Sequence, residues 1–240
     1  MKLYDEVIEK VLSLSYEACE SASNQMSAEW PKVSDRSMIL RSDMAYELGA
    51  DLQYGIGFSM ITESSELVAG DKVRLLGPDL KDIKKDNPYA RVSIIRIKPD
   101  ALGSGETLYN AIRKLEYSRY HFYPDGFMMR VSSSKQKESV RVGKDALKKG
   151  LSLGITGQIF GELLKENPAV MAVETIYITD PSFDYERLDA LAKEAEGITK
   201  TIDHIFKNVV MDCKACNLQE ICDEVEGLKE LHFKQQNANI

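Results

Sequence analysis

The sequence has few cysteines, a single tryptophan and no long apolar run. Four cysteines among 240 residues are too few for a secreted scaffold that depends on disulfides. No stretch approaches the roughly 18 consecutive apolar residues that a membrane-spanning helix needs. The N-terminal segment carries Asp5, Glu6 and Glu9 where a signal peptide needs an unbroken apolar core. We therefore expect a cytoplasmic chain without a membrane span.

Basic residues are also in deficit. Lys and Arg number 31 against 38 Asp and Glu, so the formal net charge is -7. An acidic chain is repelled by nucleic acid unless its basic residues cluster, so we expect no nucleic-acid partner. Hydrophobic residues make up 43% of the sequence, which is ample for a buried core.

The hydrophobic pattern mixes helices with consecutive strands. Runs rich in β-branched residues predict strands at 54–61, 72–76, 91–97 and 170–179, and a hairpin of 127–132 with 138–142. Helical spacing predicts helices at 2–28, 107–122, 144–150, 156–167 (capped by Thr156) and 184–210. This order favours the α+β class, with a mixed β-sheet packed with helices, over a strictly alternating doubly wound fold.

A polar, turn-rich segment from 32 to 49 indicates a domain boundary. We expect three parts. They are an N-terminal helix and linker (1–35), an α+β domain (36–182), and a helix followed by a cysteine segment (183–240).

The cysteine segment carries the strongest chemical pattern. Cys213, Cys216 and Cys222 follow the spacing Cys-x2-Cys-x5-Cys. A tight turn between the first two points both sulfur atoms at one centre, and the third closes the same pocket from the start of a following helix. The spacing therefore indicates a metal or cluster site.

Three thiolates need a fourth ligand for a [4Fe–4S] cluster or a tetrahedral zinc site. Cys19, on the N-terminal helix, and His232 are the candidates. A cluster prefers a fourth cysteine, whereas zinc accepts three cysteines and a histidine. We expect a [4Fe–4S] cluster, with structural zinc as the first alternative and free or redox-active thiols as the second. Cys19 is equally consistent with a small buried side chain on the apolar face of its helix.

Three further segments carry a family resemblance. They read RSDMAYELG at 41–49, VRLLGPDL at 73–80 and RVGKDALKKG at 141–150. In this order, over residues 36 to 182, they resemble the acetyl-CoA synthase family, the β-type subunit of the carbon monoxide dehydrogenase/acetyl-CoA synthase complex. The resemblance covers the domain that precedes the family's nickel-site domain.

The resemblance implies a role in one-carbon metabolism of an anaerobe. In the family, the next domain holds a nickel–iron–sulfur centre through cysteines that include a Cys-Gly-Cys. This sequence contains no Cys-Gly-Cys, so we expect an iron–sulfur accessory or binding component that lacks the nickel-binding catalytic domain. Carbon monoxide dehydrogenase/acetyl-CoA synthase subunits or a corrinoid protein would be its partners. Two alternatives stay open: an acetyl-CoA synthase component completed by a partner subunit, and a zinc-stabilised interaction module.

The resemblance also implies a position near coenzyme A (CoA). CoA carries several phosphate charges, and forked or flexible cations bind such charges. The basic residues of the predicted helix and hairpin are therefore the candidates: Arg113, Lys114, Arg119, Arg130 and Arg141. The alternative is that they are solvated surface charges. No residue pattern indicates a catalytic group.

Overall fold

A computed structural model describes residues 2–17, 30, 38–50, 54–103, 106–132, 136–206 and 221. The described elements are, in chain order, α1 (Asp5–Glu17), β1 (Met44–Leu48), β2 (Gly55–Thr62), β3 (Lys72–Leu76), β4 (Tyr89–Ile97), α2 (Glu106–Tyr117), the 3-10 helix η2 (Ser118–His121), β5 (Phe127–Val131), β6 (Glu138–Gly143), α3 (Lys144–Lys148), α4 (Leu153–Lys165), β7 (Val170–Ile178) and α5 (Tyr185–Phe206). Mixed sheets packed with helices confirm the predicted α+β class.

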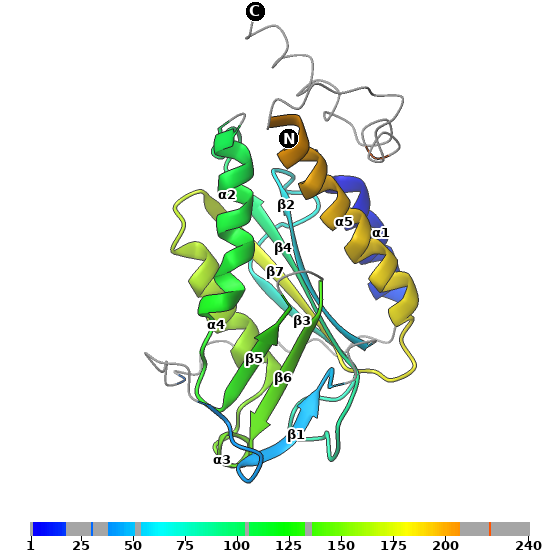
Figure 1. The fold of residues 1–240 in the computed structure, drawn as a ribbon, viewed down its shortest axis with the longest axis vertical. Coiled ribbons are helices and arrows are strands. Elements are labelled where there is room, and N and C mark those ends of the chain that lie inside the picture. Colours follow the sequence, from blue (N-terminus) through cyan, green and yellow to red (C-terminus); the bar gives the residue numbers. More distant parts are fainter. Residues whose placement is uncertain are drawn as a thin grey trace, which may run out of the picture.

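Two sheets lie next to each other (Figure 1). The larger has the order β2-β4-β7-β3, with β2 parallel to β4, β4 antiparallel to β7, and β7 parallel to β3. The smaller has the order β1-β6-β5 and is antiparallel throughout. An isolated bridge between Ile56 and Lys137 joins the β2 edge of the larger sheet to the hairpin of the smaller one.

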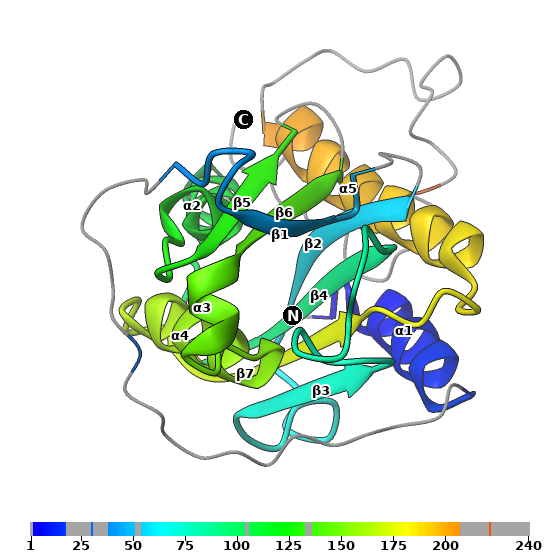
Figure 2. The ribbon, with the colours of Figure 1, turned by 90° about the horizontal axis from the view of Figure 1, so that it is seen from below.

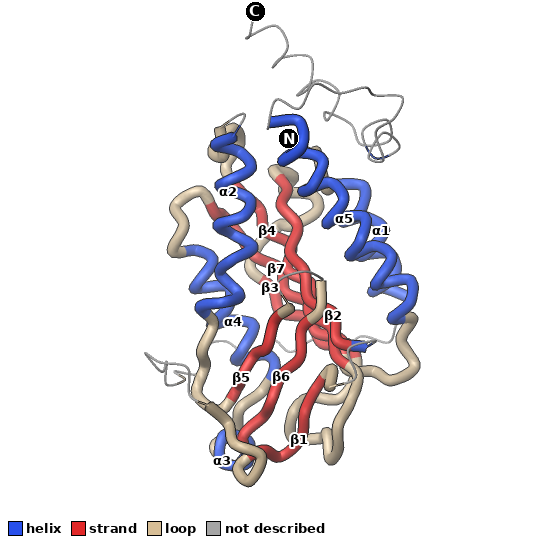
Figure 3. Tube along the Cα trace, in the orientation of Figure 1, coloured by secondary structure: helices blue, strands red, loops and turns tan. Residues whose placement is uncertain are grey.

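Helices cover the larger sheet from two sides. Figures 1 and 3 show α2 and α4 on one side and α1 and α5 on the other, and Figure 2 shows the same arrangement from below. The central strands β4 and β7 are therefore buried along almost their whole length. This explains their nearly continuous apolar sequences, which are typical of strands covered on both faces. No described helix is long and apolar enough to cross a lipid bilayer.

Helices α1 and α5 pack against each other in antiparallel directions. The Tyr4 and Thr199 hydroxyls, which are buried, lie 2.8 Å apart, and Lys10 Nζ lies 2.9 Å from Glu194 Oε1. Apolar residues of both helices belong to the same buried cluster as the sheet residues. The proposed division of the chain at residues 35 and 182 stays a prediction.

Two local predictions are wrong. Strand β1 lies within the segment from 32 to 49, which the sequence indicated to be polar and turn-rich. It forms because its residues pair with β6, almost a hundred positions later, so no local pattern revealed it. Thr156 is not a helix cap: it lies inside α4 and donates to Leu153 O, whereas Ser152 caps the helix and accepts from Ile155 N at 3.1 Å.

The predicted hairpin is confirmed. Strands β5 and β6 pair antiparallel, with Met128 opposite Arg141 and Arg130 opposite Ser139. Residues 133–135 at its tip lie outside the described residues. The hairpin brings the predicted basic residues of two strands into one small sheet.

Candidate ligand-binding site

A pocket of about 360 Å³ lies between the edge strand β5 and the segment that begins at η2. Its lining combines two arginines with aromatic and thioether side chains: Met38, Arg119, Tyr120, Tyr123, Phe127, Met128, Met129, Arg130 and Val131. Small-molecule sites have volumes of roughly 300–1,000 Å³ and are mostly apolar with a few convergent polar groups. This pocket has that composition.

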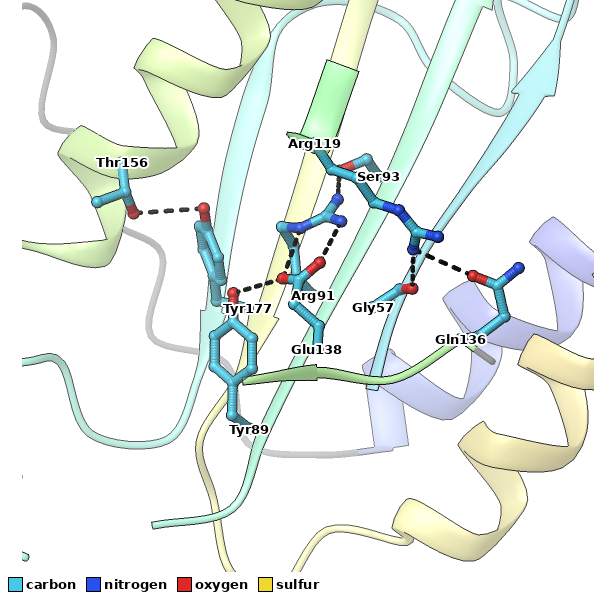
Figure 4. Close-up of polar contacts among 9 residues, drawn as sticks. All are labelled: Gly57, Tyr89, Arg91, Ser93, Arg119, Gln136, Glu138, Thr156 and Tyr177. Carbon is cyan, nitrogen blue, oxygen red and sulfur yellow. Dashed lines mark hydrogen bonds and ion pairs between the residues drawn. The ribbon is translucent and has the colours of Figure 1, made fainter. Parts of the chain in front are cut away.

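Arg119 supplies the buried cation of the pocket. Only 8% of the residue is exposed. Its Nη1 donates to Gly57 O at 2.8 Å and to Gln136 Oε1 at 3.2 Å (Figure 4). Its buried Nε has no hydrogen-bond partner among the described residues. A buried donor without a partner is costly, and an arginine edge of this kind matches the two oxygens of a carboxylate or phosphate.

Arg130 lies at the rim of the same pocket, and its side chain is 51% exposed. It shares Glu47 with Arg141: Arg130 Nη1 lies 2.7 Å from Glu47 Oε1, and Arg141 Nε lies 3.4 Å from Glu47 Oε2. One carboxylate thus offsets one of the two positive charges, and the Arg130–Arg141–Glu47 group keeps a net charge of about +1. Arg141 does not line the pocket, so the structure brings together Arg119 and Arg130 from the predicted set.

Arg113 and Lys114 lie in a different pocket, of about 590 Å³, together with His121. Arg113 already donates to Glu116 Oε2 at 2.6 Å and to Tyr117 Oη at 2.9 Å. The pocket lies at the C-terminal ends of α2 and α4, where the helix carbonyls carry partial negative charge. These charges disfavour a phosphate, so Arg113 does not extend the Arg119 site.

A buried ion pair lies deeper in the molecule, and the sequence analysis missed it. Arg91 donates from Nε to Glu138 Oε1 at 2.9 Å and from Nη2 to Glu138 Oε2 at 2.7 Å. Both side chains are fully buried. Tyr89 donates to Glu138 Oε1 at 3.1 Å, and Arg91 Nη1 donates to Ser93 Oγ at 2.8 Å (Figure 4). The guanidinium also stacks 4.6 Å from the centre of the Phe160 ring.

Arg91 stays charged and the neighbouring tyrosines stay protonated. Burial alone lowers the pKa of Arg91, but the charge and hydrogen bonds of Glu138 raise it above its usual range. Burial, followed by the charge of Glu138, raises the pKa of Tyr89 well above normal. Burial also raises the pKa of Tyr177, whose hydroxyl lies 3.3 Å from that of Thr156. The group therefore holds β6 of the small sheet to β4 of the large one.

Three glycines make this close approach of the sheets possible. A Cβ atom added to Gly49 would lie 2.9 Å from Glu138 O, and one added to Gly55 would lie 2.6 Å from the same oxygen. A Cβ atom on Gly57 would lie 2.6 Å from Glu138 Cβ. Real Cβ atoms do not approach other atoms this closely, so the seam between the sheets has room for the glycine backbone alone.

The predicted metal ligands Cys19, Cys213, Cys216, Cys222 and His232 lie outside the described residues. One residue of the cysteine segment is described. Ile221 packs against the core, and a Cβ atom added to Gly197 of α5 would lie 2.6 Å from its Cδ1. The residue before Cys222 thus contacts α5. Elsewhere in the described ranges, no three metal-ligating side chains are grouped together.

Comparison with known proteins gives two kinds of match. The family model of the CO dehydrogenase/acetyl-CoA synthase complex beta subunit matches residues 30–183. A similar protein is the acetyl-CoA decarbonylase/synthase complex subunit beta 1 of Methanocaldococcus jannaschii, 24% identical over 220 residues, which are 88% of this chain and 28% of that protein. Another is the beta subunit of the same complex of Archaeoglobus fulgidus, 29% identical over 156 residues, which are 64% of this chain and 29% of that protein.

The chain therefore spans less than a third of the length of these two relatives. The family model nevertheless covers well over half of the chain and includes all three segments that carry the resemblance, together with both arginines of the pocket. The expected relationship is confirmed: this chain belongs to the family of the CO dehydrogenase/acetyl-CoA synthase complex beta subunit.

Proposed function

We propose that this chain is a CoA-binding component of an acetyl-CoA decarbonylase/synthase system. The observation that carries the proposal is Arg119, a nine-tenths buried arginine that lines a pocket of aromatic and thioether side chains and whose Nε finds no hydrogen-bond partner in the part of the chain that the structure describes. The relatives named above are subunits of such a complex. The proposed role is binding, because the pocket lining offers cations and apolar surfaces to a ligand.

The pocket chemistry fits one end of CoA. The Nε edge of Arg119 suits the oxygens of a phosphate, and the half-exposed Arg130 provides a second cation at the rim. The Tyr120 and Tyr123 rings suit the flat face of adenine. Met128 and Met129 offer adaptable apolar contacts. At about 360 Å³ the pocket accommodates the nucleotide part, and the rest of the ligand extends along the surface.

Replacement of Arg119 by Gln is expected to weaken CoA binding by about 10- to 100-fold, because a charge-assisted hydrogen bond contributes roughly 1.5–3 kcal/mol. Arg119→Lys is expected to lose most of the same affinity, since lysine keeps the charge but lacks the planar fork. The fluorescence of Trp30, the single tryptophan, measures binding: its Nε1 donates to Asp125 O, which lies near Tyr123 and Phe127 in the chain.

Arg187→Gln is the matched control, because Arg187 is exposed on α5 and does not line the pocket. Thermal unfolding of each variant shows whether the fold is intact. CoA binding of equal strength in the Arg119→Gln, Arg187→Gln and wild-type proteins would contradict the proposed site. Absence of CoA binding to the wild-type protein would contradict the proposed function.

We also propose that Cys213, Cys216 and Cys222 hold a [4Fe–4S] cluster, with Cys19 as the fourth ligand and His232 as the alternative. The donor set supports this: three thiolates at this spacing suit iron and sulfide, and zinc accepts the same three with a histidine. Such a cluster would transfer single electrons or hold the C-terminal segment against the rest of the protein.

Metal analysis after anaerobic purification tests the cluster. The wild-type protein is expected to contain about four iron and four sulfide ions and to be brown. Cys213→Ser is expected to lose most of both, whereas Cys19→Ser loses them only if Cys19 is a ligand. His232→Ala is the matched variant for the alternative ligand. Colourless wild-type protein with one equivalent of zinc would contradict the proposed cluster and support a structural zinc site.

A further inference from the structure

Three consecutive residues hold the β5–β6 hairpin against the rest of the molecule. We call Gln136, Lys137 and Glu138 the latch. Gln136 O accepts from Gly57 N at 3.1 Å, and Gln136 Oε1 accepts from Arg119. Glu138 binds Arg91 as described above. Each latch residue therefore contacts a different part of the fold.

Lys137 connects the latch to α5. Its Nζ lies 2.7 Å from Asp189 Oδ1, and the two side chains are only 16% and 22% exposed. Lys193, one turn further along α5, lies 2.8 Å from the other oxygen of Asp189. Burial alone raises the pKa of Asp189, but the hydrogen bonds from Lys137 and Lys193 outweigh it and hold that pKa below its usual range. The carboxylate is thus charged near neutral pH and bridges the hairpin and the helix.

Arg119 lines the pocket and also contacts the latch residue Gln136. Its Nη1 is bound to Gly57 O and Gln136 Oε1, while its Nε lacks a partner among the described residues. The edge that contains Nε is separate from Nη1 on the planar guanidinium. An anion on that edge leaves both Nη1 contacts in place and restricts the movement of the whole group. Occupancy of the pocket therefore orders the side chain on which Gln136 depends.

We propose that the latch couples the pocket to α5, so that an anion on Arg119 stabilises the first half of α5 against local opening through Gln136 and Lys137. The coupling deepens the proposed function and rests on it for the identity of the ligand. Because such coupling is reciprocal, contacts that stabilise α5 also strengthen ligand binding. The same helix contacts α1 and Ile221, so the effect extends to both of these contacts.

A ligand-free double-mutant cycle tests the latch itself by hydrogen exchange of the α5 backbone amides at residues 189–196. Gln136→Ala is expected to speed this exchange about fivefold in the wild-type background and to have little effect in the Lys137→Met background. Lys193→Met is the matched control. It removes the lysine that contacts the other carboxylate oxygen of Asp189 and leaves the hairpin contact of Lys137 in place. In that background Gln136→Ala should keep its full effect. Equal effects of Gln136→Ala in all three backgrounds would overturn the coupling.

A second experiment measures the hydrogen exchange of the same α5 amides with and without saturating CoA. CoA is expected to slow their exchange about fivefold in the wild-type and Lys193→Met proteins, and not in Lys137→Met protein that still binds CoA. Equal slowing in Lys137→Met protein, or none in wild-type protein that binds CoA, overturns the proposal. If the wild-type protein does not bind CoA, the proposed function fails, and the ligand-free cycle alone decides the latch.

Discussion

Replacement of Glu138 by Gln is expected to lower the free energy of unfolding by about 3–5 kcal/mol, because it leaves the fully buried Arg91 without its counter-charge. Glutamine has nearly the same shape as glutamate, so the loss reports on charge and not on packing. The Tyr89 hydroxyl also loses its charged acceptor. Urea denaturation followed by circular dichroism measures the change.

Two variants show whether the effect comes from the buried charge. Lys148→Met breaks an ion pair with Asp145 whose side chains are 77% and 82% exposed, and we expect a change below about 0.5 kcal/mol. The double variant Arg91→Met, Glu138→Leu removes both charges and is expected to recover much of the lost stability. A Glu138→Gln protein as stable as the Lys148→Met protein would show that the pair does not hold the two sheets together.

Replacement of Gly57 by Ala is expected to cost about 1–3 kcal/mol through overpacking. The added Cβ atom would lie 2.6 Å from both Cβ and Cδ of Glu138. Because the carboxylate is held by Arg91 and Tyr89, it cannot move away without breaking these hydrogen bonds. The midpoint of urea denaturation measures the change.

Gly70→Ala is the matched control, because a Cβ atom at Gly70 would meet no atom within 4 Å. We expect its effect on stability to be close to zero. In the Glu138→Gly background, Gly57→Ala should cost much less than in the wild-type background, since the clashing side chain, including its Cβ atom, is gone. If Gly57→Ala lowers the free energy of unfolding equally in both backgrounds, the strain does not come from contact with the Glu138 side chain.

Much of the fold could be predicted from local patterns. Strands β3 and β7 and the β5–β6 hairpin follow from β-branched runs bounded by turn residues, and α5 follows from its helical spacing. Strand β1 could not be predicted, because its stability comes from pairing with a distant strand. The predicted helix from 107 to 122 is wrong beyond Tyr117, where the chain tightens into the 3-10 helix η2.

The candidate site was predictable only in part. No local pattern separates Arg119 and Arg130 from Arg113 and Arg141, because their grouping depends on how η2 packs beside β5. The Arg91–Glu138 pair did leave a signal: Arg91 lies in a mostly apolar run, and a charged residue in a buried strand requires a partner. Its partner could not be assigned, because it comes from the other sheet. The cysteine ligands stay a prediction.

The glycine seam has a consequence for mutational scans of ligand binding. Gly49, Gly55 and Gly57 do not line the pocket themselves, although the carbonyl oxygen of Gly57 accepts from Arg119. Any side chain at these positions would nevertheless push Glu138 and the adjoining Gln136 away from Arg119. Substitutions at these spacer positions should therefore abolish binding as thoroughly as substitutions of residues that touch the ligand. A scan that measures binding alone would therefore indicate a false binding surface along the junction of the two sheets. Measuring the amount of folded protein for each variant would separate these positions from residues that touch the ligand.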